Sequence, residues 1–133
     1  MERDLVISSQ LINLNKVRHF LDEFFKESCL NKNNFNRVLL GISEAVNNSI
    51  VHGNGLAAEK NVYLGIKYVD NKLLIEVKDE GSGFDAECIN DPTCVENIRK
   101  ESGRGIFLLR GIADEVVYFD GGRSVFIKYN LDK

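Results

Sequence analysis

The fold is decided by residues 43–55, SEAVNNSIVHGNG. They complete a run of apolar residues spaced three and four apart, namely Phe35, Leu39, Ile42 and Val46. This spacing predicts an amphipathic helix. The glycines Gly53 and Gly55 are typical of residues that end a helix.

Glu44 and Asn48 are the polar residues of this helix that could carry chemistry. They are one helical turn apart and lie away from the apolar stripe, so packing does not require them. A carboxylate can accept a proton from a hydroxyl group or water, and an amide oxygen is a suitable ligand for Mg²⁺. A solvated polar face would give the same pattern, and the spacing alone leaves that alternative open.

On either side of this helix the chain mixes helices with hairpins. We expect, in chain order, an edge strand within residues 5–14, a helix over 15–30, the deciding helix, a hairpin of strands 61–69 and 72–78, a long loop over 80–102, a helix from Gly103, and final strands over 115–119 and 124–131. This order predicts an α+β fold. It would be a two-layer α/β sandwich with a mixed, mainly antiparallel sheet.

A second candidate segment is VKDEGSGFD, residues 77–85. Asp79 stands at the end of a predicted strand, where its carboxylate could accept a hydrogen bond from an exocyclic amine such as that of adenine. Gly81 and Gly83 would let the backbone bend and approach a ligand closely. An ordinary glycine-rich turn would explain the glycines equally well.

A third candidate segment is SGRGIFLLRGIADEV, residues 102–116. Gly103 and Gly105 lead into a predicted helix, whose exposed N–H groups favour an anion such as phosphate. Arg104 could add positive charge. A tight turn before a packed helix is the alternative. The chain has no G-x-x-x-x-G-K-[ST] motif, so this is not a Walker P-loop.

Length and charge narrow the classes of function. With 133 residues and 15.0 kDa, we expect one domain over residues 1–133. The net charge of −3 and the pI near 5.4 argue against direct binding to a nucleic acid. No apolar run is long enough to span a membrane, and MERDLVISSQ lacks the apolar core of a secretory signal. These observations predict a cytoplasmic protein with no membrane partner.

The residues of the three segments, and their order along the chain, resemble the motifs of a known family. Glu44-x-x-x-Asn48 resembles the N box of the Bergerat-fold ATPases, the superfamily of gyrase and the histidine kinases. Asp79-x-Gly81-x-Gly83 resembles the G1 box, and Gly103-x-Gly105 resembles the G2 box. Within the superfamily, SEAVNNSIVHGN and the ADEV that follows the G2 segment resemble the RsbW-like anti-sigma factor serine kinases.

The resemblance implies a Bergerat ATP-binding fold with an ATP lid and a role for each motif. Glu44 would be the general base that activates a serine hydroxyl, Asn48 would bind Mg²⁺, and Asp79 would bind the adenine amine. Gly81 and Gly83 would shape the adenine pocket. At the end of the lid, Gly103, Arg104 and Gly105 would close on the phosphates.

The resemblance also implies partners. These would be an anti-sigma factor antagonist as the protein substrate, a sigma factor and a second copy of the chain in a homodimer. The leading hypothesis is an ATP-dependent protein-serine/threonine kinase that regulates transcription by partner switching. The alternative is a non-catalytic binding module gated by ATP or ADP, because nucleotide binding requires Asn48 and Asp79 but not Glu44.

Overall fold

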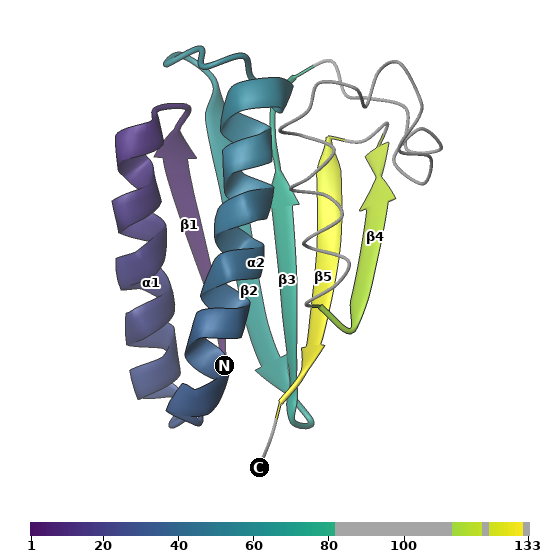
Figure 1. Cartoon of the computed structure of the whole chain (residues 1–133). Coiled ribbons are helices and arrows are strands. Elements are labelled where there is room, and N and C mark those ends of the chain that lie inside the picture. The colour runs from purple at the N-terminus through teal and green to yellow at the C-terminus, as the bar shows by residue number, and fades with distance from the viewer. Residues whose placement is uncertain (82–112, 121–122, 132–133) are drawn as a thin grey trace.

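Two helices cover one face of a five-stranded sheet in the computed structural model (Figure 1), which describes residues 1–81, 113–120 and 123–131. In chain order the elements are β1 (Glu2–Ser8), a 3-10 turn (Leu11–Asn13), α1 (Leu14–Glu27), a second 3-10 turn (Lys32–Asn34), α2 (Phe35–Asn48), a π-helical turn (Ser49–Gly53), β2 (Asn61–Val69), β3 (Lys72–Lys78), β4 (Glu115–Phe119) and β5 (Ser124–Asn130). The predicted α+β two-layer sandwich is confirmed.

The sheet has the order β1-β2-β3-β5-β4. In the described part of the chain all four pairings are antiparallel, so the mainly antiparallel sheet contains no parallel pair there. The predicted hairpin is confirmed with the same bounds. Its turn residues Asp70 and Asn71 have φ of 51° and 63°, the positive values required by the mirror-image turn that suits a two-residue hairpin.

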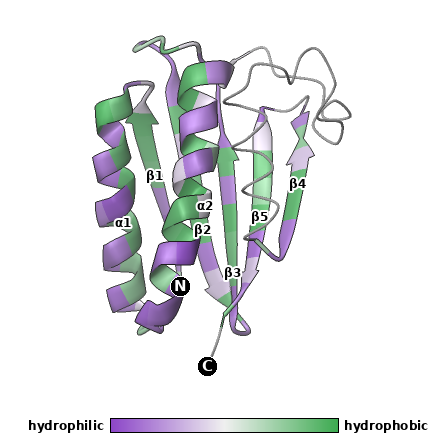
Figure 2. Ribbon diagram, viewed as in Figure 1, coloured by the Kyte–Doolittle hydropathy of each residue, from purple (hydrophilic) through white to green (hydrophobic). Residues whose placement is uncertain are grey.

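Alternating residues of the strands face the helices and form the core. The alternation of hydrophobic and hydrophilic residues can be followed along the strands in Figure 2. From α2 and the turn after it, the fully buried side chains include Val38, Ile42, Val46 and Ile50, which follow the predicted helical spacing. Phe35 and Leu39 are only half-buried. No helix in the described ranges is both long and apolar enough to cross a membrane.

The N-terminal strand differs from its predicted range. It spans Glu2–Ser8 instead of lying within residues 5–14, although it is an edge strand as expected. The reason is Asn13, which is buried and donates from Nδ2 to the Ser8 carbonyl oxygen at 2.9 Å and to Ser8 Oγ at 2.8 Å. These hydrogen bonds stabilise the reversal that leads into α1.

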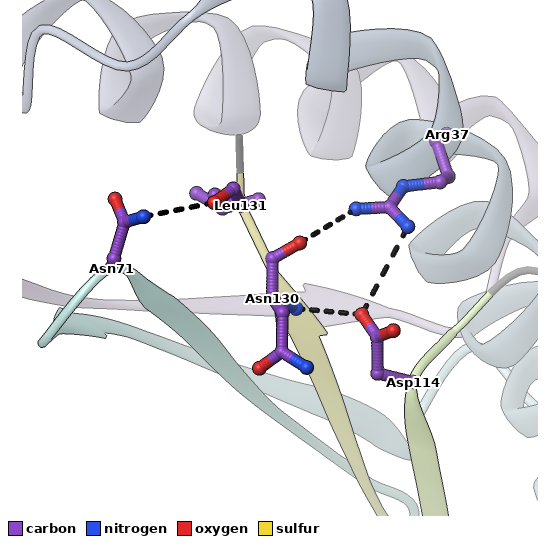
Figure 3. A network of polar contacts seen from close by, with 5 residues as sticks. All are labelled: Arg37, Asn71, Asp114, Asn130 and Leu131. Carbon is purple, nitrogen blue, oxygen red and sulfur yellow. Dashed lines mark hydrogen bonds and ion pairs between the residues drawn. The ribbon is translucent and has the colours of Figure 1, made fainter. Parts of the chain in front are cut away.

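A polar network connects the first turn of α2 to the end of the sheet (Figure 3). Arg37 Nη2 donates to the carbonyl oxygen of Asn130 at 3.0 Å, and the Asn130 N–H donates to Asp114 Oδ2 at 2.6 Å. The Arg37 guanidinium also lies 5.4 Å from the centre of the Tyr129 ring. The start of the helix that carries Glu44 and Asn48 is therefore fixed against β5 and the residue before β4.

Candidate functional site

The end of α2 changes its helical geometry. Residues Ser49–Gly53 form a π-helical turn, and the N–H of Asn54 closes it by donating to the Ser49 carbonyl oxygen at 2.8 Å. Single π-helical turns in proteins are frequently found at functional sites. The predicted end of the helix at Gly53 and Gly55 is confirmed, and Gly55 has a φ of 59°, which favours glycine.

Asp79 directly follows β3 and is only 3% exposed. Its Oδ1 accepts the N–H of Gly81 at 2.8 Å, and its own N–H donates to the Arg123 carbonyl oxygen at 2.9 Å. Burial raises the pKa of the Asp79 carboxyl above its ordinary value of 3.8, while the Gly81 hydrogen bond and the charges of Arg123 and Lys60 oppose the rise. The other carboxylate oxygen, Oδ2, lies against the backbone of Gly53.

The predicted N box and G1 segments meet in the structure. A Cβ on Gly53 would lie 2.9 Å from Asp79 Oδ1 and would overlap Oδ2, and a Cβ on Gly81 would overlap the Gly53 carbonyl oxygen. Neither position has room for a side chain. The two glycines therefore allow the helix end and the strand end to lie in direct contact.

Glu44 and Asn48 are half-buried on the last turn and a half of α2. Their partial burial distinguishes them from the exposed residues of the same helix, such as Asn36 and Leu40. Asn48 immediately precedes the π-helical turn that ends at Gly53.

The sequence motifs did not identify Asn54, which lies at the contact between the end of α2 and the Asp79 segment. It is 3% exposed, and its Oδ1 accepts the N–H of Glu80 at 2.8 Å. Its Nδ2 donates to Ser9 Oγ at 2.8 Å and to the Asn61 carbonyl oxygen at 3.0 Å. In the sequence, Asn54 stands between two glycines and is typical of a helix-ending segment, which conceals its tertiary role.

The other predicted positions lie outside the described residues. These are Gly83, Gly103, Arg104 and Gly105, together with most of the expected lid and the helix predicted from Gly103. Among the positions that are described, no group of three or more histidine, cysteine, aspartate or glutamate side chains could hold a metal ion. The described part of the site thus offers a buried hydrogen-bond acceptor, a half-buried amide and a half-buried carboxylate.

A profile described as "Histidine kinase-like ATPase domain" matches residues 7–129. The chain belongs to this family. The matched range contains the α2 end and the Asp79 segment, so the contact between them lies within the histidine kinase-like ATPase domain.

Curated relatives and a solved structure agree with the family. The chain is 29% identical to "Serine-protein kinase RsbW" of Staphylococcus epidermidis, a match that covers 97% of this chain and 86% of the relative. It is 31% identical to "Anti-sigma F factor" of Oceanobacillus iheyensis over 69% of this chain and 66% of the relative. A crystal structure of the RsbU and RsbW domains of a Mycobacterium tuberculosis protein superimposes with a TM-score of 0.70 at 14% identity.

That solved chain is longer, because the match covers 98% of the present chain but 32% of the other. At this identity the superposition shows the fold alone. The fold of this histidine kinase-like ATPase domain is therefore that of the RsbW domain, and the predicted resemblance to the family is confirmed.

Proposed function

We propose that this histidine kinase-like ATPase domain binds Mg-ATP and phosphorylates a serine or threonine of an anti-sigma factor antagonist. The observation that carries the proposal is the contact of the α2 end with the Asp79 segment through Gly53 and Gly81. It brings three of the proposed functional positions, Glu44, Asn48 and Asp79, onto two adjoining elements of one fold.

The adenine is assigned to Asp79. In this assignment Oδ1 of the buried carboxylate accepts the Gly81 N–H, and Oδ2 would accept the proton of the exocyclic amine. We assign Gly81 and Gly83 to the same pocket. Gly103, Arg104 and Gly105 are assigned to the phosphates, with N–H groups and one guanidinium as donors.

Magnesium is assigned to Asn48. Among the described residues, no cluster of carboxylates could bind a metal ion by itself. In nucleotide sites, however, Mg²⁺ keeps several waters and is otherwise bound by one or two protein oxygens and by the phosphates. A single half-buried amide oxygen fits that requirement. When bound, the ion would neutralise charge on the phosphates.

Glu44 is assigned as the general base. The acceptor hydroxyl would lose its proton to the Glu44 carboxylate as its oxygen forms a bond to the γ-phosphorus, and the bond from that phosphorus to the bridging oxygen of ADP would break. Most of the acceleration in such transfers comes from positioning and charge stabilisation. A glutamate on a helix that is fixed at both ends is suited to that task.

The partners follow from the relatives named RsbW and anti-sigma F factor. We assign a sigma factor as the protein that this chain would sequester, and the antagonist as both the substrate and the competitor. Phosphorylation of the antagonist would then return the chain to the sigma factor. We further assign a homodimer and a cytoplasmic location.

The decisive experiment is phosphotransfer from labelled ATP to purified antagonist domains, measured together with ATP affinity. We expect Glu44→Gln to lose phosphotransfer and to retain ATP affinity, because binding does not use the base. Glu23→Gln is the matched control, since Glu23 is an exposed glutamate of α1, and it should behave as the unchanged chain.

One outcome would overturn the kinase proposal, and another would overturn only the role of Glu44 as the base. Normal ATP affinity without transfer to any antagonist would favour the non-catalytic module gated by nucleotide. Unchanged transfer in Glu44→Gln would show that another group accepts the proton.

A further inference from the structure

The side chain of Asn54 is unusual because every one of its polar groups is used inside the protein. Nδ2 donates to Ser9 Oγ at 2.8 Å and to the Asn61 carbonyl oxygen at 3.0 Å, and Oδ1 accepts the Glu80 N–H at 2.8 Å. These partners belong to the residue after β1, the first residue of β2 and the second residue after β3. One amide therefore joins three strands to the end of α2.

The orientation of this amide is fixed by its partners. Ser9 Oγ donates its only proton to the Lys60 carbonyl oxygen at 2.7 Å, so it can only accept a hydrogen bond from Asn54. The Glu80 N–H can only donate, and it therefore requires the oxygen of the amide. An exchange of the nitrogen and oxygen of Asn54 would leave both contacts unsatisfied.

The bond to Glu80 acts on the candidate nucleotide site. Glu80 lies between Asp79, whose carboxylate contacts Gly53, and Gly81, whose backbone contacts the Gly53 carbonyl group. Asn54 follows Gly53 directly, so the backbone contact and the Asn54 hydrogen bond join the same two segments. The peptide after Asp79 is thus held to the helix end from two sides.

We infer that Asn54 is a positioning residue for the nucleotide site, which sets the place of the Asp79 carboxylate relative to the end of α2. The inference rests on the proposed function, in which Asp79 binds adenine and Asn48 binds Mg²⁺ on the same helix. Asn54 itself would touch neither the nucleotide nor the metal. It acts through the Glu80 peptide.

The test compares Asn54→Ala with Asn13→Ala by ATP affinity and by melting temperature. Asn13 is a matched control because it is also buried and also makes two hydrogen bonds through Nδ2, to Ser8. Both variants should melt at a lower temperature. At a temperature where both are folded, only Asn54→Ala should bind ATP on the order of tenfold more weakly, the loss expected when one buried hydrogen bond no longer holds a contact group.

A third variant separates positioning from general stability. In Ser9→Ala the amide of Asn54 keeps its bonds to Asn61 and Glu80, so this variant should lose stability while its ATP affinity stays within about threefold of the unchanged chain. Should Asn54→Ala fail to fold, Asn54→Ser is measured in its place, because serine is too short to reach all three partners at once.

The ATP affinities of the three variants decide whether Asn54 positions the nucleotide site. Weaker ATP binding in Asn54→Ala, with normal binding in Asn13→Ala and Ser9→Ala, supports the inference. Normal ATP binding in the Asn54 variant, or losses that follow the melting temperature in all three variants, would overturn it. Failure of the unchanged chain to bind ATP would overturn the proposed function itself and is seen before any variant is compared.

Discussion

The carboxylate of Asp79 lies directly against the backbone of Gly53, and a Cβ on Gly53 would come within 2.9 Å of Asp79 Oδ1. The two residues are far apart in the sequence, and the contact brings the end of a helix to the end of a strand. The absence of a side chain at position 53 is thus a requirement of the candidate site.

Gly53→Ala should therefore displace Asp79 and weaken ATP binding on the order of tenfold, the equivalent of one lost hydrogen bond to the ligand. Gly55→Ala is the control, because a Cβ there meets nothing within 4 Å. Its positive φ makes alanine cost about 1 kcal/mol of stability, and its ATP affinity should not change. Titration calorimetry on both variants checks this, and equal losses would contradict it.

Replacement of Asp79 should change the pH dependence of stability. Because the folded-state pKa of Asp79 is raised above 3.8, the folded chain holds this proton more tightly than the unfolded chain does. The contribution of Asp79 to stability is therefore largest below pH 3.8 and declines as the pH rises from there through the raised pKa. Asp79→Asn removes this decline.

Urea unfolding of both chains between pH 4 and 8 measures the effect. The stability of Asp79→Asn relative to the unchanged chain should increase with pH over the lower part of this range and then level off. A constant difference would show that the Asp79 pKa is not raised. The same variant should bind ATP more weakly at neutral pH, since the amide replaces one acceptor by a donor.

Asn48→Ala should weaken ATP binding in the presence of Mg²⁺ at least on the order of tenfold, a loss seen even when only the support of a metal ligand is removed. Binding without Mg²⁺ should be unaffected. Asn47→Ala is a matched control, since Asn47 is the neighbouring half-buried asparagine. Equal losses for Asn48→Ala with and without the metal would exclude Asn48 as a ligand.

Tyr129→Phe should leave stability unchanged or raise it by up to about 1 kcal/mol. The Tyr129 hydroxyl is buried and has no hydrogen-bond partner within the described residues, and burial raises the pKa of this group. Tyr68→Phe is the comparison, because the Tyr68 hydroxyl donates to Asn71 Oδ1 at 3.0 Å. It should lose about 1 kcal/mol. Thermal unfolding distinguishes the two, and a clear loss in Tyr129→Phe would contradict the prediction.

The sequence predicted those parts of the fold whose signal is local. The hairpin Asn61–Val69 and Lys72–Lys78 was predicted with its observed bounds, because its β-branched and aromatic residues and the turn pair Asp70 and Asn71 are visible in the chain. The bounds of β1 were not, because its first residues are charged and lie at an exposed sheet edge. Asn13 bonds to Ser8 at the end of β1, and the spacing of residues in the sequence does not predict such hydrogen bonds.

The candidate site also has one part that the sequence predicted and another that it did not. Glu44 and Asn48 were predicted to share a face of a helix, and that follows from helical periodicity. The direct contact of Gly53 with Asp79 depends on two segments that meet only in the folded chain. Asn54 could not be found from spacing because its three partners come from different strands.

The strand order has a consequence for the length of the connection between β3 and β4. β5 lies between β3 and β4, so the ladder bonds of β3 come from β2 and β5, and the polypeptide that leaves after Asp79 returns only at the outermost strand. Insertions, deletions or even a chain break within that connection would not remove any ladder bond of the central strands. The pairing of the central strands therefore sets no fixed length for this connection, and only the positions assigned to the nucleotide would constrain it.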